Sequence, residues 1–448
     1  MATHLPPAGD RSGNDDAYLT GRGAAWFAFA MTLALMLFDY IDRQVIVSLF
    51  PHMKADWGLS DKELGALVSV VSVTVALGAL RVALVADRAS RVKSIAVMAT
   101  AWSLATISCM FTRSYGQLLA ARAVVGVGEA GYGSVGAALI ASVFPARMRG
   151  TLLAAFFATA SVGSVLGVLL GGLIASKWGW QAAFGVVGFP GLALALLYLK
   201  VRDYKTVALT PTLDQATRST GSTVAFVAKS LAKSRTMLWV CLGGAAQLVV
   251  VSAVWSWLPS FLNRYHGLPP DQAAVRAALV VLVGALGSVV WGNVIDRAGS
   301  RRPRRKLFTM AVLCVATLLV LVFAFAGTGP AAAPPPGQFG LIALGGFLMT
   351  CSVGPVSAIV IDVIHPGVRA TGASVLALFQ NLFGLAAGPF IVGVLSDSVG
   401  LATALTLVPG FGALAGLFFV LASRSYEADV QRVAAVPVAA DIAPAGAG

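Results

Sequence analysis

The sequence predicts an all-α membrane protein in which twelve transmembrane helices form two pseudo-symmetric bundles of six. Three observations support this prediction. The chain of 448 residues is 58% hydrophobic and only 11% charged, with a mean hydropathy of +0.83, whereas about 25% of the residues in a soluble domain are charged. Its apolar residues gather in runs long enough to cross a bilayer. The second half of the chain also repeats motifs of the first half.

The apolar runs define the expected spans. About 20 apolar residues cross the hydrocarbon core as one helix, and charged residues, glycines and prolines such as Pro145 and Gly179 separate the runs. The expected spans are residues 25–50, 63–86, 94–112, 116–143, 150–176, 181–200, 236–263, 272–295, 307–327, 338–364, 371–396 and 400–423.

A polar stretch divides these spans into two bundles. Within it, Thr223–Arg235 alternates apolar and basic residues at helical spacing, which predicts a short helix on the membrane surface. The Ala/Pro-rich C-terminal tail has the composition of a disordered segment. The expected domains are a cytoplasmic N-terminal tail (1–24), an N-terminal bundle (25–200), a cytoplasmic linker (201–235), a C-terminal bundle (236–423) and a disordered tail (424–448).

The basic residues predict that both termini are cytoplasmic. The chain holds 32 Lys and Arg against 19 Asp and Glu. With both ends inside, most of the basic residues fall in cytoplasmic segments, as the positive-inside rule requires. We therefore expect a multi-pass protein of the bacterial inner (plasma) membrane rather than a nucleic-acid-binding protein. The basic residues left on the outer side are Lys54, Lys62, Arg113, Lys177 and Arg264.

Several classes of function lack a signal in the sequence. The four cysteines all lie inside apolar runs, so they predict neither disulfides nor a metal site. The chain contains no P-loop and no H-E-x-x-H motif, and its four histidines lie at loop-like positions. We therefore expect no enzyme activity, no ATP-driven pump, no metal and no cofactor.

The two halves echo each other in their loops. Ala83–Arg91 (ALVADRASR) matches Gly292–Arg301 (GNVIDRAGSR), and Phe144–Thr151 (FPARMRGT) matches His365–Thr371 (HPGVRAT). A repeated unit in one orientation is typical of two-halved transporters with a pathway between the halves. On these residues the chain resembles the major facilitator superfamily over about residues 24–423. The resemblance implies the major facilitator fold and alternating access.

Within that superfamily the chain resembles the spinster branch. The matching segments are DYIDRQ (Asp39–Gln44), RAVVGVGEAGYG (Arg122–Gly133), GSVLGVLLGG (Gly163–Gly172) and WLPSFL (Trp257–Leu262). The first motif usually reads N-Y-x-D-R, so Asp39 replaces an uncharged residue. The resemblance implies an organic substrate that is amphipathic, anionic or lysolipid-like.

Ionisable residues near the middle of two spans form the candidate coupling site. Asp39, Asp42 and Arg43 share one face of the first span, and Arg122 and Glu129 lie two turns apart on the fourth. An ionised side chain at the centre of a membrane helix costs roughly 2.5–3.5 kcal/mol, so these residues predict a polar pathway. We expect the three acids to exchange protons and the two arginines to tune them or bind an anionic group. A static ion pair that fixes helix packing is the alternative.

The repeated DR-x-x-x-R loops are the candidate cytoplasmic gate. Asp87 and Asp296 each lie at the end of a span, where a carboxylate meets the positive end of a neighbouring helix. Ion pairs between the arginines and acids such as Asp362 would stabilise the outward-open state. Alternatively, the arginines only determine topology. The candidate gate residues are Asp87, Arg88, Arg91, Asp296, Arg297, Arg301, Asp362 and Arg369.

Small and amphipathic residues supply two further candidate sets. Gly163, Gly167, Gly171 and Gly388 let helix backbones approach closely, which suits either a seam along which the halves rock or ordinary tight packing. A substrate lining on the first, fourth, seventh and eleventh spans is the second set, with ordinary packing as the alternative for each member. Its residues are Tyr40, Tyr132, Gln247, Trp255 and Asn381.

These features together predict a secondary active transporter that works by alternating access. We expect it to couple protons to a small organic molecule as a monomer in the lipid bilayer. A drug/proton antiporter and an organic-anion symporter of the same superfamily are the alternatives within this class. A channel or a non-transporting receptor is the alternative of another class. A channel leaves the duplicated gate loop unexplained, and a receptor does not require acids at mid-membrane.

Overall fold

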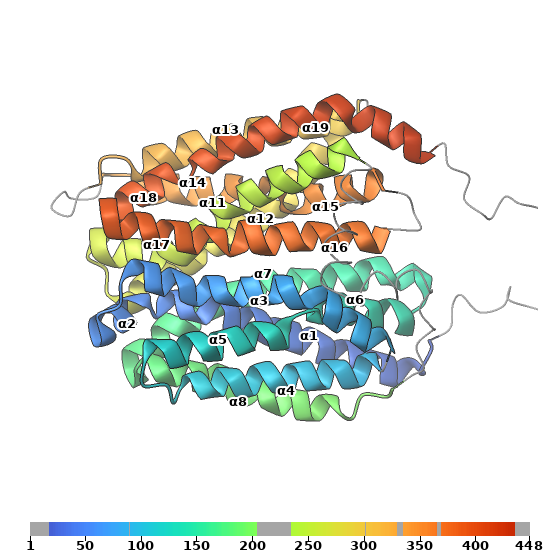
Figure 1. Ribbon diagram of the computed structural model, residues 1–448, viewed down its shortest axis with the longest axis horizontal. Helices are drawn as coiled ribbons and strands as arrows, with labels where there is room; N and C mark the ends of the chain where they lie inside the picture. Colours follow the sequence, from blue (N-terminus) through green and yellow to red (C-terminus); the bar gives the residue numbers. More distant parts are fainter. Residues whose placement is uncertain are drawn as a thin grey trace, which may run out of the picture.

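The computed structural model describes residues 18–88, 90–203, 234–300, 302–328, 335–364 and 369–434. Its helices form two groups that lie side by side, the N-half (residues 22–198) and the C-half (residues 235–434) (Figure 1). Within the described ranges there is no strand, and twelve helical segments are long and apolar enough to cross a membrane. The predicted all-α fold with twelve spans is therefore confirmed.

The helices of both halves follow the chain in order. The N-half contains α1 (Arg22–Val45), the 3₁₀ helix η1 (Ile46–Ser48), α2 (Phe50–Trp57), α3 (Asp61–Arg88), α4 (Arg91–Cys109), α5 (Tyr115–Glu129), α6 (Tyr132–Val143), α7 (Ala146–Trp178) and α8 (Trp180–Tyr198). The C-half contains α11 (Arg235–His266), α12 (Pro270–Gly299), α13 (Arg304–Phe325), α14 (Gln338–Met349), the 3₁₀ helix η2 (Thr350–Ser352), α15 (Val353–Asp362), α16 (Arg369–Phe379), the π-helix η4 (Gln380–Leu385), α17 (Ala387–Val399), α18 (Leu401–Leu407) and α19 (Gly410–Ala434).

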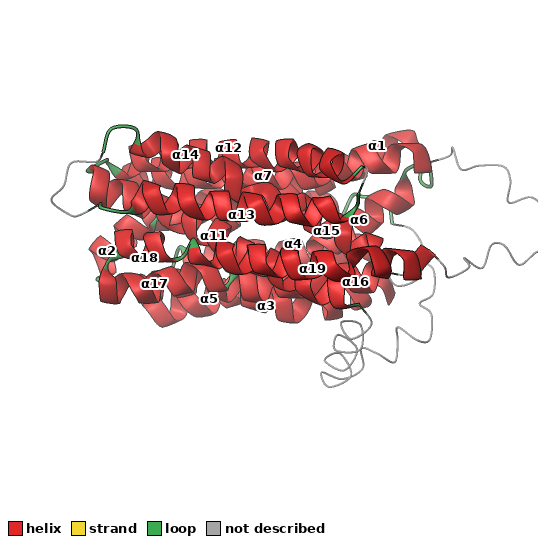
Figure 2. Ribbon diagram, turned by 90° about the horizontal axis from the view of Figure 1, so that it is seen from above, coloured by secondary structure: helices red, strands yellow, loops and turns green. Residues whose placement is uncertain are grey.

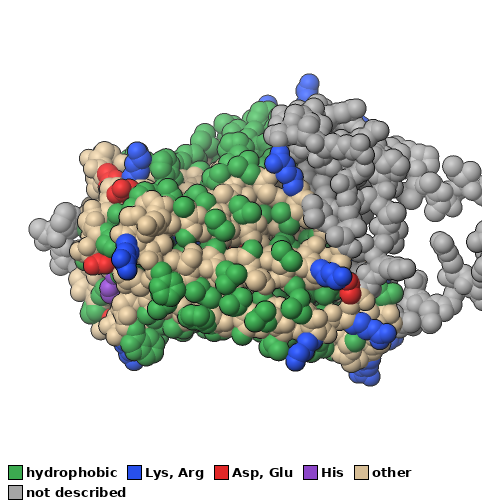
Figure 3. Space-filling view, turned by 60° about the horizontal axis from the view of Figure 1, so that its bottom comes forward, with side chains coloured by type: hydrophobic (Ala, Val, Ile, Leu, Met, Phe, Trp, Pro, Cys, Tyr) green, Lys and Arg blue, Asp and Glu red, His purple; other side chains and the backbone are tan. Residues whose placement is uncertain are grey.

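The helices run roughly along the long axis of the molecule, which gives it two distinct ends (Figure 2). We call the end where α1 begins and α19 ends the terminal end, and the opposite end, where α2 and α18 lie, the distal end (Figure 1). Hydrophobic side chains cover the middle of the face shown in Figure 3, whereas charged side chains lie near its two ends. This distribution is that of a protein surrounded by lipid at mid-height.

Local sequence signals explain where several helices begin and end. Ser90, Ser114 and Ser234 each precede a helix, and each hydroxyl accepts a hydrogen bond from the backbone N–H three residues later, which is the usual N-cap arrangement. Gly58 and Gly267 follow α2 and α11 in the left-handed conformation, which glycine adopts without steric cost.

Several expected spans are interrupted helices. The fourth span breaks between α5 and α6, where Ala130 leaves the helical region and Gly131 has φ of 84°. The tenth span breaks at η2. The first span continues through η1 into α2, which lies at the distal end. Interruptions in the fourth and tenth spans fall at corresponding places in the two halves, in agreement with the sequence repeat.

The chain ends differ in part from the expectation. The helix of the twelfth span continues to Ala434, so the expectation that residues 424–448 form a disordered tail is wrong for residues 424–434. These residues stay helical because they pack on the C-half: Asp429 accepts hydrogen bonds from Ser234 and from the backbone of Thr236. The surface helix expected over residues 223–235 lies, except for its last two residues, outside the described part of the chain.

Three clusters of buried apolar side chains hold the bundle together. One cluster belongs to the terminal end of the N-half and includes Phe29 and Phe144, and another belongs to the terminal end of the C-half and includes Leu307 and Phe419. The third, which we call the distal cluster, combines residues of both halves. The halves therefore share a core at the distal end, whereas each has its own core at the terminal end.

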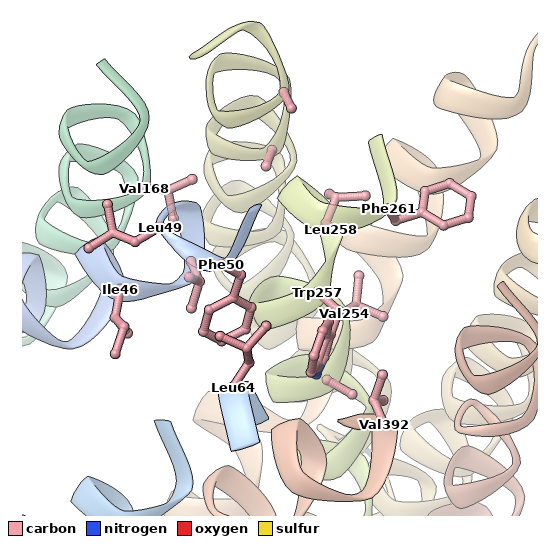
Figure 4. Close-up of a cluster of buried hydrophobic side chains, with 14 of the residues drawn as sticks. Ile46, Leu49, Phe50, Leu64, Val168, Val254, Trp257, Leu258, Phe261 and Val392 are labelled. Atoms are coloured by element: carbon pink, nitrogen blue, oxygen red, sulfur yellow. The ribbon is translucent and has the colours of Figure 1, made fainter. Parts of the chain in front are cut away.

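The distal cluster is closed by aromatic contacts between the halves. Phe50 of α2 packs on Trp257 of α11 with ring centroids 5.1 Å apart, and both side chains are fully buried (Figure 4). Two helix pairs extend the contact between halves, α3 with α17 and α7 with α12.

Candidate functional site

The charged residues of the first and fourth spans come together in two groups. In the first group, Arg43 lies between two acids: its Nε is 3.0 Å from Glu129 Oε2 and 3.3 Å from Asp39 Oδ2. The Glu129 side chain is fully buried and that of Asp39 is 4% exposed, whereas that of Arg43 is 18% exposed. Arg43 is therefore the member of this group that solvent or a ligand can reach.

The second group lies deeper inside the N-half. Arg122 Nη1 is 3.4 Å from Asp42 Oδ1, and the side chains of both residues are 1% exposed. The hydroxyl of Thr106 on α4 donates to Asp42 Oδ2 at 2.8 Å. Asp42 also lies in a narrow crevice between α1, α4 and α8, together with Ser103. Sequence reasoning missed Thr106, because its hydroxyl is one of several in the third span, such as those of Thr100, Ser103 and Ser108.

The helix geometry explains how α1 contributes residues to both groups. Asp39 and Arg43 are about one turn apart on α1, so that they point to the same side, whereas Asp42 is rotated by about 60° from Asp39 and about 100° from Arg43. Glu129 is the last residue of α5, just before the break. The C-terminus of a helix carries a partial negative charge and favours a cation, which Arg43 supplies.

Several polar atoms in these groups have no hydrogen-bond partner within the described part of the chain. They include Asp39 Oδ1 and both Glu129 carboxylate oxygens. Arg43 Nε approaches Glu129 Oε2 to 3.0 Å, but this contact is poorly aligned for a hydrogen bond. Two nitrogens of Arg122 share this condition. A carboxylate offers about four acceptor positions, so Glu129 has acceptor capacity to spare. Glu129 also lies near the carboxyl of Asp42.

The expected substrate-lining residues are not gathered in one place. The Arg43 guanidinium lies over the Tyr40 ring, 5.6 Å from its centroid. Tyr132, in contrast, is 1% exposed and donates to Thr32 O at 2.6 Å, packed between the rings of Trp102 and Phe156. Tyr132 is therefore part of the N-half core, and its expected place in a substrate lining is wrong for this conformation.

The lining candidates of the C-half make contacts within that half. Gln247 is fully buried and donates to the backbone oxygen of Met349 at 2.9 Å, next to the break of the tenth span. Asn381 donates to Ala377 O of its own helix. Trp255 is half-buried, and its ring lies beside Gly284. Gln247 therefore supports the interrupted helix, while Asn381 and Trp255 remain candidates for the lining.

The described gate residues also interact within their own halves. Arg91 donates to Ser142 at 2.8 Å, Asp296 lies 3.1 Å from Lys306, and Asp362 accepts from Tyr426 at 2.8 Å. Asp362 thus has a tyrosine of the C-half as its partner among the described side chains. Arg297 is exposed. The remaining gate candidates, whose side chains lie outside the described part, are Asp87, Arg88, Arg301 and Arg369.

The glycine seam lies inside each half rather than between the halves. A Cβ added to Gly163 or Gly167 would lie 2.7 Å from Leu37 O or 2.6 Å from Ile41 O, and Gly171 faces the next turn of α1 in the same way. Gly388 faces α11. These contacts match the alternative of ordinary tight packing, and a seam on which the halves rock is wrong for these four glycines.

Comparisons with known proteins agree with this fold. The model of the Major Facilitator Superfamily matches residues 32–389. Spinster homolog 3 of Danio rerio is 26% identical over 460 residues, covering 94% of this chain and 89% of that protein. An MFS-type efflux pump of Mycolicibacterium smegmatis is 29% identical over 426 residues, covering 93% of this chain and 96% of the pump.

A solved structure has the same fold. The crystal structure of a bacterial homolog of the human lysosomal transporter Spinster, in an inward-facing and occupied conformation, matches with a TM-score of 0.79 at 21% identity, covering 91% of this chain and 99% of that chain. Both the family and the fold are those of transporters, not of enzymes. This chain belongs to the Major Facilitator Superfamily, and its relatives support the resemblance to the spinster-like branch.

Proposed function

We propose that the protein is a proton-coupled secondary transporter of a small anionic or amphipathic organic molecule. The charge balance of the site carries this proposal. Three acids (Asp39, Asp42 and Glu129) lie with two arginines (Arg43 and Arg122) in a largely buried site. With all acids ionised, one negative charge is left over, and an uncompensated buried charge is costly. One proton restores neutrality.

Glu129 and Arg43 are the residues that link the proton to the substrate. When Glu129 is ionised, it attracts Arg43 (Nε to Oε2, 3.0 Å). When Glu129 takes up a proton, this attraction is lost, and the guanidinium becomes available to an anionic group. Arg43 is also the most exposed member of its group, and guanidinium binds carboxylate and phosphate through paired hydrogen bonds. Binding of an anion and protonation of Glu129 therefore favour each other.

Charge supports one orientation of the protein in the membrane, and packing supports one conformational state. With the terminal end in the cytoplasm of a bacterial cell, the basic segments obey the positive-inside rule. The shared distal cluster then supports a state in which the halves are held together at the outer side, while each half keeps its own core at the cytoplasmic side. Alternating access requires a second state in which this pattern is reversed.

A drug/proton antiporter is the second candidate function. The 29% identity to an MFS-type efflux pump favours it. Against it, Val168 follows Gly167 where the span 5 signature of such antiporters has proline. The same acids serve symport and antiport, so the direction of the proton relative to the substrate separates the two.

The test is substrate-dependent proton movement in proteoliposomes. A stabilisation screen with lysophospholipids, fatty acids and sugar phosphates selects a compound, and a pH-sensitive dye inside the vesicles then records proton flux when that compound is added. Glu129→Gln is expected to abolish this flux. Glu63→Gln is the matched control. Glu63 lies at the distal end, where its carboxylate accepts hydrogen bonds from the backbone N–H and the hydroxyl of Ser60 at the start of α3. Coupled proton flux that survives Glu129→Gln would refute the role of Glu129.

A further inference from the structure

The distal end holds a second charged network, which joins the two halves. Asp61, the first residue of α3, accepts two hydrogen bonds from Arg264 of α11, Nη1 to Oδ2 at 2.6 Å and Nη2 to Oδ1 at 2.7 Å. Lys54 of α2 donates to the same carboxylate at 2.6 Å, and Ser396 of α17 donates to it as well. One carboxylate thus receives donors from both halves.

In a second contact, the acid belongs to the C-half and the donors belong to the N-half. Asp397 of α17 accepts from the backbone N–H of Asp61 at 2.8 Å and of Lys62 at 2.9 Å. These are the first two N–H groups of α3, which have no partner inside the helix. The positive end of a helix favours a carboxylate, so Asp397 of the C-half caps a helix of the N-half.

The network is partly shielded from water, which makes it stronger than a surface ion pair. The Asp61 side chain is 2% exposed and that of Arg264 is 25% exposed. The guanidinium lies over the Trp257 ring, 6.0 Å from its centroid, and Trp257 packs on Phe50 in the distal cluster. Exposed pairs stabilise little, whereas a two-point hydrogen bond between Arg and a buried carboxylate is stronger and directional.

The same two spans carry the candidate gate at the other end. The second span begins at Asp61 and ends beside Asp87, and the eleventh begins at Arg369 and ends beside Asp397. The two spans are antiparallel neighbours through α3 and α17. At the distal end the positive end of α3 lies next to Asp397 of α17, and towards the other end α16 contacts α3. When the halves tilt, contacts at one end form at the expense of contacts at the other.

We propose that Asp61, Arg264 and Asp397, with Lys54 and Ser396, form a distal latch whose release is required for the distal end to open. This inference rests on the alternating access in the proposed function but not on the proton or the substrate. The latch holds the halves together at the outer side and counteracts the cytoplasmic gate. Weakening the latch shifts the population towards the outward-open state.

The test measures conformation without any substrate. Spin labels on Gln117→Cys and Ser398→Cys report the separation of the halves at the distal end, and labels on Lys93→Cys and Arg305→Cys report it at the terminal end. All four positions are exposed, while the four native cysteines are buried. Double electron–electron resonance in nanodiscs then gives the ratio of outward-open to inward-open molecules.

Asp61→Asn and Asp397→Asn are expected to raise this ratio by roughly 10- to 100-fold, since each removes the negative charge and one of the two acceptor oxygens. Asp56→Asn is the matched control: it is an acid of the same end, but it accepts from Trp180 of its own half at 3.0 Å. The ratio for this control is expected to equal that of the parent.

Two results would overturn the latch. One is an unchanged ratio in both Asp61→Asn and Asp397→Asn, and the other is an equal shift in Asp56→Asn, which would indicate a general effect of charge. If Asp61→Asn does not fold, Arg264→Gln breaks the same two hydrogen bonds and is judged by the same criteria. Because no substrate is present, these outcomes are independent of whether Glu129 couples protons.

Discussion

Replacing Arg122 by Met is expected to destabilise the N-half through the acid that Arg122 leaves behind. The Asp42 carboxylate is buried, and the polar groups placed on its oxygens are Arg122 at 3.4 Å and Thr106 at 2.8 Å. Arg122 is the cation that compensates its charge. Breaking a buried ion pair by removal of one partner costs about 3–5 kcal/mol. The 3.4 Å separation is long for a charged hydrogen bond, and two Arg122 nitrogens already lack partners. We therefore expect a loss of about 3 kcal/mol.

The double variant Asp42→Asn/Arg122→Met is expected to recover most of this loss. Asn still accepts from Thr106 and carries no charge that requires a partner. Neutral replacement of a buried ion pair is often without cost. The cost of Arg122→Met alone is expected to be smaller at pH 5 than at pH 8, because a protonated Asp42 also carries no charge.

The assay is the free energy of unfolding, measured by titration with sodium dodecyl sulfate in mixed micelles. Arg276→Met is the control, since Arg276 is exposed and lies over the Phe339 ring, a contact that stabilises by only about 0.5–1 kcal/mol. Equal stability of Arg122→Met and the parent would contradict the prediction, and so would a double variant that is no more stable than Arg122→Met.

Two further predictions concern packing in the N-half. Gly167→Ala is expected to destabilise by about 1–3 kcal/mol, because its Cβ would lie 2.6 Å from Ile41 O; Gly116→Ala, which meets open space, is the control in the same unfolding titration, and equal losses would contradict the prediction. Tyr132→Phe removes a hydrogen bond to Thr32 O and is expected to lower the free energy of unfolding by about 0.5–1.5 kcal/mol. Proton flux in vesicles is expected to stay unchanged. A loss of flux at normal stability would indicate that Tyr132 takes part in transport.

The spans and the charged residues could be predicted because their signals are local. An apolar run of about 20 residues in a bilayer satisfies its backbone hydrogen bonds by itself when it forms a helix. Ionised residues inside such a run require a polar surrounding, so Asp39, Arg43 and Glu129 were found without a structure. The break at Ala130–Gly131 was not found, because a glycine in an apolar run is also compatible with an uninterrupted helix.

The pairing of these charges could not be predicted. Three acids and two arginines allow several pairings, and the sequence left Asp42 and Glu129 open to either arginine. The choice depends on how α1 and α5 are rotated about their axes, which many distant contacts determine together. The same holds for the latch: Asp61 and Asp397 are far apart in the chain and meet only because α3 and α17 are antiparallel neighbours.

The sequence by itself determined that this chain is a membrane protein of twelve helices, which charged residues fall inside the apolar spans, and which superfamily it resembles. Apolar length and charge are properties of single segments, so they can be read without knowing what those segments contact. The tertiary structure decided that Arg43 forms ion pairs with Glu129 and Asp39. It also decided that Tyr132 and the four glycines of the seam pack inside their own halves, and that the halves are joined at the distal end. Contacts between helices depend on rotation and depth, which no single segment specifies.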